Sequence, residues 1–267
     1  MKRILSTLAG LALSASALAF DHDHKAWDDI LRRHVRYVEN GTASRVDYAG
    51  VAKDRAAFKA VLDDYQKVTG AEFDAWTKPR QQAFLFNAYN AFTIEKILAR
   101  YPGIQSIRDF GTVFGNPWKD KFFTLFGKPS HLDQIEHEIL RKEGVYDDPR
   151  VHVAVVCASI GCPMLRNEAF VADRLEAQLE DAFRRFLSDR TRNRYNPQSG
   201  KLEVSRIFDW YGKDFEKGHK GNATVKQALS RYSDLLADKP ADRAIVKAQQ
   251  AEVTFLDYDW SLNDVKK

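Results

Sequence analysis

The chain has 267 residues, of which 44% are hydrophobic, 12% aromatic and 29% charged, and its formal net charge is +4 at pH 7. This composition is that of a globular protein and excludes general disorder, and the length allows a full hydrophobic core. So small an excess of positive charge does not predict a nucleic-acid partner.

The first residues have the pattern of a secretory signal peptide. Met1–Arg3 supplies positive charge, an apolar stretch follows, and Ala17 and Ala19 are the small residues that precede a cleavage site. The apolar stretch is too short to span a bilayer comfortably, and no other segment is apolar enough. We therefore expect residues 1–19 to be removed, leaving residues 20–267 as a periplasmic or secreted protein without a membrane span.

Periodic apolar residues and Gly or Pro stop signals predict a mostly helical chain. Helices are expected over residues 26–40, 54–68, 78–100, 131–142, 168–189, 207–215, 224–236 and 241–251. Extended segments are expected over residues 45–48, 122–126, 151–156, 201–204 and 253–259. Strands and helices do not alternate regularly, and no repeat or linker divides the chain. The expected fold is α+β, a mostly helical single domain around a small β-sheet, with a papain- or transglutaminase-like architecture as one candidate.

Both cysteines lie directly after the extended segment expected at 151–156. That strand would place Cys157 in a turn of small residues that Cys162 closes, and strand-to-loop transitions are common positions for reactive groups. In an oxidising compartment the pair would instead tend to form a disulfide, whose short loop contributes about 2 kcal/mol. Redox exchange is a minor third hypothesis, because the pair lacks the short spacing of a Cys-x-x-Cys motif.

Several short motifs follow one another along the chain. They are Val46-Asp-Tyr48, Phe86-Asn-Ala-Tyr-Asn-Ala91, Ile135-Glu-His137, Arg150-x-His-x-Ala-x-x-Cys-Ala-Ser-x-x-Cys-Pro163, Phe208-x-Trp-Tyr211 and Tyr258-Asp-Trp-Ser-Leu-Asn263. Together they resemble the bacterial and plant family called domain of unknown function 547, over nearly all of residues 20–267. The resemblance implies no established activity and no catalytic residues, so the chemistry has to come from the residues themselves.

Two asparagines share one face of the helix expected at 78–100. Asn87 and Asn90 lie among large apolar residues, and buried amides are costly unless they are hydrogen-bonded. One hypothesis is that they tie a loop to the helix. The other is that one of them orients a catalytic histidine or donates a hydrogen bond to an oxyanion.

Nucleophilic cysteine catalysis requires a base close to Cys157. Strand alternation would place His152 on the face opposite Cys157, so the preferred candidate is His137, on the preceding helix. The side chains that would orient His137 are Tyr89, Asn87, Asn90 and Glu136. A metal site is not expected, because His131 and His137 are on different helix faces and no further ligand cluster accompanies them. No cofactor is expected.

Two function classes remain. The first is a cysteine-dependent amide or peptide hydrolase or acyl transferase with Cys157 as nucleophile. The second is a non-catalytic envelope binding or interaction module shaped by a Cys157–Cys162 disulfide. In either case the expected partner is a small molecule or a peptide, and the substrate-binding candidates are Tyr89, His152, Ser159, Trp210 and Tyr211. The aromatic residues of 208–215 and 258–260 are expected to pack together as the C-terminal strand docks.

Overall fold

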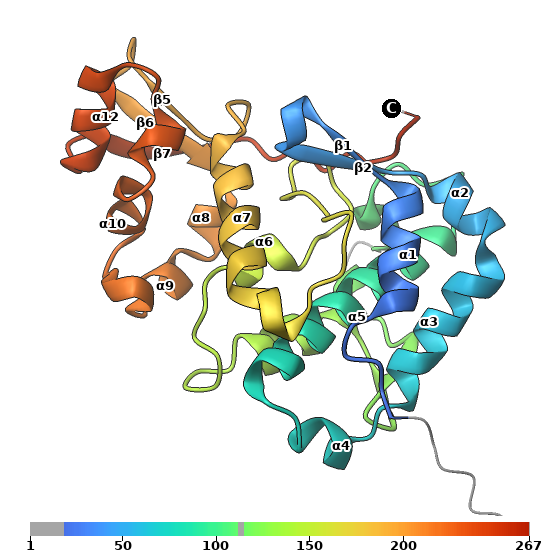
Figure 1. Cartoon of the computed structure of the whole chain (residues 1–267). Helices are drawn as coiled ribbons and strands as arrows, with labels where there is room; N and C mark the ends of the chain where they lie inside the picture. Colours follow the sequence, from blue (N-terminus) through green and yellow to red (C-terminus); the bar gives the residue numbers. More distant parts are fainter. Residues whose placement is uncertain (1–18, 112–114, 267) are drawn as a thin grey trace, which may run out of the picture.

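The computed structural model describes residues 19–111 and 115–266 and confirms the predicted α+β class (Figure 1). Its α-helices are α1 (Lys25–His34), α2 (Tyr48–Lys53), α3 (Arg55–Lys67), α4 (Gly70–Asp74), α5 (Lys78–Leu98), α6 (Val151–Ala154), α7 (Leu175–Ser188), α8 (Ile207–Trp210), α9 (Gly212–Phe215), α10 (Val225–Ser230), α11 (Ser233–Leu236) and α12 (Pro240–Lys247). A π-helix, η4 (Gln134–Leu140), and the short 3₁₀ turns η1 (Glu39–Gly41), η2 (Ile107–Phe110), η3 (Pro117–Lys119), η5 (Ala172–Arg174) and η6 (His219–Gly221) complete the helical segments. No helix in the described ranges is both long and apolar enough to cross a bilayer. The predicted leader, apart from Ala19, lies outside the described residues.

The strands form three small sheets rather than one. Antiparallel pairs join β1 (Val35–Val38) to β2 (Ala43–Val46) and β3 (Phe123–Leu125) to β4 (Lys128–Ser130). In the third sheet β6 (Lys201–Ser205) lies between the antiparallel β5 (Arg194–Asn196) and the parallel β7 (Glu252–Leu256). Figure 1 shows this sheet at one end of the molecule, beside α10 and α12. A sheet therefore does not occupy the middle of the fold.

The middle of the fold is occupied by α5, which Figure 1 shows between α3 and α7. Every residue from 83 to 94 is buried. A helix that is apolar on all sides is stable only when protein surrounds it, and this one is covered by α3 on one side and by η4 and η5 elsewhere. The boundaries expected from the sequence, 78–100, agree with the observed helix to within two residues at its end.

Two hydrophobic cores lie on either side of α6. The larger core contains the buried faces of α1, α3 and α5, and the smaller contains those of α7, α8 and α10 together with β6. Val151 and Ala154 of α6 pack in the larger core, whereas Val153 packs in the smaller one. The short helix that precedes Cys157 is therefore held from both sides.

The strand predicted at 151–156 is wrong, because its first four residues form the helical turn α6. The amide of Val155 donates to the Val151 carbonyl at 3.0 Å, and only from Val155 onward is the chain extended. A short apolar run fits a buried helix as well as a buried strand, so tertiary packing decides between them. The helix predicted over 26–40 is also too long, since the chain leaves it at His34 to form β1.

After β7 the chain crosses from the smaller core to the larger one. It passes the segment that follows Cys157 and ends beside β2, where Val46 and Asp264 form a parallel bridge. The Tyr48 hydroxyl donates to Asn263 Oδ1 at 2.7 Å and fixes this end in the larger core. Trp210 packs against Tyr258 and Trp260, with ring centroids 5.0 and 5.7 Å apart, so the predicted aromatic packing is present. The contacts with β2 and Tyr48 extend the docking beyond it.

Candidate active site

A pocket of about 280 Å³ lies between the two cores. Val155 of the larger core and Ile207 of the smaller core both line it. It brings together most of the side chains singled out in the sequence, namely Tyr89, Glu136, His137, His152, Cys157, Cys162, Trp210 and Tyr211. Asn87, Asn90 and Ser159 do not line it. Its other polar and aromatic lining residues were not among the predicted site residues: Asn116, Trp118, Asp133, Tyr258 and Trp260.

Hydrogen-bond donors converge on the sulfur of Cys157. Its Sγ lies 3.1 Å from the Tyr258 hydroxyl and 2.8 Å from the Cys162 sulfur, and Ser159 also contributes. Burial alone would raise the pKa of the Cys157 thiol, but these hydrogen bonds outweigh burial and lower the pKa below its ordinary value. Burial holds the pKa of Tyr258 well above its usual range, so that its hydroxyl keeps the proton that it donates.

Cys162 has the opposite character. Its side chain is buried, and burial together with the neighbouring Cys157 sulfur raises the pKa of its thiol. The backbone amide of Cys157 donates to the Cys162 sulfur at 2.9 Å. Both cysteines are free thiols, and their separation of 2.8 Å exceeds the bond length of about 2.05 Å. The disulfide therefore stays a prediction.

Asn90 positions the segment that carries Cys157. Its Nδ2 donates to the Ala154 carbonyl at 2.8 Å, and its Oδ1 accepts from the amide of Val156 at 3.0 Å. Both ends of the buried amide are thereby used where α6 ends and the extended approach to Cys157 begins. Asn90 therefore ties a loop to the helix, which was one of its two predicted roles, and the loop is the one that carries Cys157.

The turn after Cys157 is held by the C-terminal segment. Ala158 has a φ of 60°, an uncommon conformation for a residue with a side chain, and its carbonyl accepts from the amide of Asn263 at 3.0 Å. Gly161 lies so close to this segment that a Cβ there would come within 2.9 Å of the Asp259 nitrogen and 3.1 Å of the Tyr258 ring. A glycine at this position is what allows Tyr258 to reach the Cys157 sulfur.

His152 forms a buried pair with Asp214. Its Nε2 lies 2.8 Å from Asp214 Oδ2, and its ring stacks on Tyr211 with centroids 3.9 Å apart. Burial, only partly offset by Asp214, lowers the pKa of His152 and keeps it neutral at pH 7. Because the Asp214 carboxylate accepts from Nε2, the lone pair of the neutral ring is on Nδ1. The argument that His152 faces away from Cys157 assumed a strand, and with the helical turn α6 both residues line the same pocket.

His137 also lines the pocket and, like His152, makes no direct contact with Cys157 in the described residues. Its Nδ1 accepts from Arg141 at 2.7 Å, and its Nε2 faces Asp133 Oδ1 at 3.7 Å. Both ring nitrogens are thus directed at other groups. The preferred base of the sequence analysis is therefore not oriented for that role, whereas His152 has an unoccupied lone pair.

Two carboxylates face the pocket from η4 and the residue before it. Glu136 accepts from the Tyr89 hydroxyl at 3.0 Å, so Tyr89 orients this carboxylate rather than a histidine. Asp133 accepts from Asn116 Nδ2 at 3.3 Å, and burial followed by the nearby Glu136 raises its pKa, with His137 acting in the opposite direction. The described residues contain no group of three or more His, Cys, Asp or Glu side chains suited to a metal ion.

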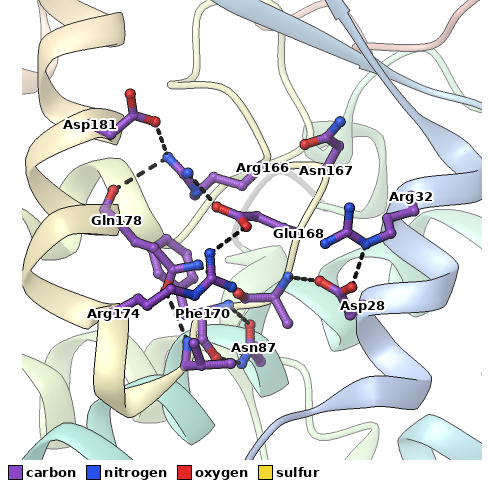
Figure 2. A network of polar contacts seen from close by, with 12 residues as sticks. Asp28, Arg32, Asn87, Arg166, Asn167, Glu168, Phe170, Arg174, Gln178 and Asp181 are labelled. Atoms are coloured by element: carbon purple, nitrogen blue, oxygen red, sulfur yellow. Dashed lines mark hydrogen bonds and ion pairs between the residues drawn. The ribbon is translucent and has the colours of Figure 1, made fainter.

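Asn87 does not line the pocket and belongs instead to the polar network of Figure 2. Its Nδ2 donates to the Phe170 carbonyl at 2.7 Å, and its Oδ1 accepts from the Phe170 amide at 3.0 Å. Near it Glu168 pairs with Arg166 at 2.5 Å and with Arg174 at 3.0 Å. Asn87 thus ties the segment around Phe170 to α5, away from the pocket.

Tyr258 and Asp214 are the functional candidates that sequence reasoning missed. Tyr258 is 101 residues from Cys157, and Asp214 is 62 residues from His152. Each lies in a segment whose aromatic residues were predicted to pack together. A polar group within such an aromatic segment was the signal that could have identified them. Nothing in local periodicity indicates which distant segment returns to the pocket.

Residues 73–187 match the model of the family described as "Protein of unknown function, DUF547". This confirms the resemblance for the segment that includes α5, η4, α6 and both cysteines. The motifs at 46–48, 208–215 and 258–263 lie outside the match. No curated protein and no solved structure matches the chain, so the papain- or transglutaminase-like architecture stays a prediction.

Proposed function

We propose that this chain, whose residues 73–187 match the model of the DUF547 family, is a cysteine-dependent amide or peptide hydrolase or acyl transferase. One observation carries the proposal. Hydrogen bonds from Tyr258, Cys162 and Ser159 favour the thiolate of Cys157 inside a pocket that also contains a neutral, carboxylate-oriented histidine. A stabilised thiolate together with an oriented base is the arrangement that thiol acyl transfer requires.

In the first half-reaction the Cys157 sulfur attacks the carbonyl carbon of the substrate. The proton that the thiol loses passes to His152 Nδ1, while Asp214 holds the opposite side of the ring and stabilises the imidazolium. The C–N bond then breaks, the leaving nitrogen takes the proton from His152, and a thioester remains on Cys157. Tyr258 no longer faces a charged sulfur at that stage, so its hydroxyl can donate to the carbonyl oxygen.

In the second half-reaction water or an amine attacks the thioester carbon and gives its proton to His152 Nδ1. The C–S bond breaks, Cys157 leaves as a thiolate, and the hydrogen bonds that favour the thiolate assist its departure. Water as the attacking group gives hydrolysis, and an amine gives acyl transfer.

Acyl-enzyme trapping tests this proposal. We expect fully reduced protein to react with p-nitrophenyl acetate in a burst equal to the protein concentration, leaving one acetyl group on Cys157 in peptide mass spectra. Cys157→Ser should lose the burst. Cys162→Ser is the matched control, because it retains a hydrogen-bond donor beside the nucleophile and should still be acylated on Cys157. A burst that persists unchanged in Cys157→Ser would show the proposal to be wrong.

A non-catalytic binding module is the second candidate, and the closeness of the two sulfurs favours it. At 2.8 Å only a small shift separates Cys157 and Cys162 from bonding distance. Protein isolated without reductant would then contain no free thiol. A titre of two thiols per chain excludes a constitutive disulfide and with it this form of the binding-module hypothesis.

We also propose that the chain is exported and processed after Ala19, on the strength of the sequence features of residues 1–19. The intact mass of the protein recovered from the envelope fraction should correspond to a chain that begins at Phe20. A mass that still includes the leader would contradict export by this route.

A further inference from the structure

We propose that the pocket beside Cys157 binds a primary ammonium group of a substrate between Glu136 and His152, against a wall of tryptophan and tyrosine rings. The inference rests on the proposed function, because it concerns the substrate class of the same site. It follows from three features of the pocket: carboxylates that no lysine or arginine pairs with, two hydrogen-bond acceptors that face each other, and an aromatic wall that includes the exposed Trp210.

The negative charge of the pocket is not balanced by basic side chains. Glu136 is 6% exposed, and in the described residues no lysine or arginine comes within 4.0 Å of its carboxylate or of that of Asp133. Arg141, which lies over the Tyr211 ring, is held by Asp214 and His137, while Lys119 acts on Asp133 only from beyond 4.0 Å. An isolated buried carboxylate is costly, so a cation from outside the chain would be stabilised here.

Two acceptors face each other across a short gap. The distance from His152 Nδ1 to Glu136 Oε1 is 3.8 Å, and neither atom has a hydrogen bond to any described residue. In the neutral tautomer fixed by Asp214, Nδ1 has a lone pair rather than a proton, so the two atoms repel unless a donor joins them. An ammonium group offers three N–H donors and a positive charge, which satisfies both atoms and the carboxylate.

Another part of the pocket lining consists of aromatic rings. Trp210 is 42% exposed, and its ring lies 5.0 Å from that of Tyr258 and 5.7 Å from that of Trp260. Trp118 adjoins Trp260 with centroids 5.9 Å apart. Such faces attract organic cations, with tryptophan the strongest of the aromatic side chains. Arg108 already lies over Trp260, 5.2 Å from the ring centroid, and Trp210 is the exposed ring of this wall. The combination of carboxylates and an exposed tryptophan suits a positive group on an aliphatic stem.

The same position suits the second half-reaction. An ammonium bound between Glu136 and His152 gives one proton to Nδ1 and becomes a neutral amine inside the pocket that contains the Cys157 thioester. The amine nitrogen then bonds to the acyl carbon while the C–S bond breaks, and the second proton of the attacking nitrogen passes to the departing Cys157 sulfur, which leaves as the thiol. A cationic side chain of the acyl donor would occupy the same position before acylation. Ammonium recognition is common to both, and experiment distinguishes them.

Binding is measured on reduced Cys157→Ser protein, which cannot be acylated. We expect 1,5-diaminopentane and n-pentylamine to quench tryptophan fluorescence saturably and n-pentanol, the uncharged analogue, to bind at least 10-fold more weakly. Glu136→Gln and Asp133→Asn should each weaken amine binding about 10-fold, whereas Glu138→Gln, an exposed carboxylate on the same π-helix, should not change it. Equal affinity for amine and alcohol, or amine affinity unchanged in both pocket variants, would overturn the inference.

Two further arms identify the source of the ammonium. With acylated wild-type protein, transfer of the acetyl group to n-pentylamine assigns it to the acyl acceptor. Faster acylation by a lysine-containing thioester than by its norleucine analogue assigns it to the acyl donor. Because the binding assay does not involve the thiol, cation binding without acylation of Cys157 contradicts the proposed function alone, and acylation without cation preference contradicts only this inference.

Discussion

Two polar networks contact α5, one through Asn87 and the other through Tyr89, and their carboxylates differ in whether an arginine pairs with them. In the network of Figure 2 all three carboxylates face arginines: Glu168 faces Arg166 and Arg174, Asp181 faces Arg166 at 2.6 Å, and Asp28 faces Arg32. In the pocket, Asp133 and Glu136 are more deeply buried than these carboxylates and have no such partner in the described residues. We infer that carboxylates paired with arginines of the same chain stabilise the fold. Charge left unbalanced beside a thiol is a property that a ligand can use.

The pKa values follow the same division. Burial acts to raise the pKa of Glu168, but hydrogen bonds from Arg166, Gln178 and Arg174 lower it to about 2. Asp133 is buried without an arginine, and its pKa is raised. The difference between the two carboxylates is thus the presence or absence of a guanidinium within hydrogen-bond distance.

The largest expected effect concerns Asp214, which pairs with His152 and also contacts Lys217. Asp214→Asn removes the charge that fixes the tautomer of His152, and we expect acyl transfer to fall about 10³-fold. Lys217→Met is the control, because Lys217 contacts the other oxygen of Asp214 at 3.0 Å and not the histidine. Equal losses in the two variants would show that Asp214 acts only on stability.

The next prediction compares the two networks through the free energy of unfolding. Glu168→Gln leaves Arg166 with a lost partner in the buried network, and we expect a cost of about 3 kcal/mol in the free energy of unfolding. Glu136→Gln removes a carboxylate that no arginine balances, so we expect unfolding stability to stay the same or to rise by about 1 kcal/mol. Urea unfolding of both variants measures this. A larger loss for Glu136→Gln than for Glu168→Gln would reverse the assignment of the two networks.

Acid sensitivity provides a smaller effect. The pKa of Glu168 is about 2 in the folded protein and about 4.5 when unperturbed, so the folded state favours its charged form. Its contribution to stability is therefore complete above pH 4.5 and is lost as the pH falls from 4.5 towards 2. Melting temperatures between pH 6 and pH 3, measured for wild type and Glu168→Gln, should converge at the acid end. A constant difference across that range would contradict the shifted pKa.

The sequence identified the elements whose signal is local. Helix α5 was predicted because its apolar pattern continues from an N-terminal Pro79 to the Tyr101-Pro102 stop, and Cys157 was selected because small residues follow an apolar run. Residues 151–156 were assigned to a strand because their valines favour one, and this error excluded His152 from the base role. The contacts of Tyr258 and Asp214 depend on chain segments that meet only in the folded protein, so no periodicity indicates them.

The most direct test of the central claim is the pH dependence of Cys157 alkylation by iodoacetamide in fully reduced protein. We predict a midpoint well below that of an ordinary thiol, which is about 8.5. Tyr258→Phe should raise the midpoint because it removes a donor to the sulfur, whereas His137→Ala should leave it unchanged because Arg141 occupies that ring. A wild-type midpoint at or above the ordinary value, unmoved by Tyr258→Phe, would contradict the account of Cys157 as a stabilised thiolate.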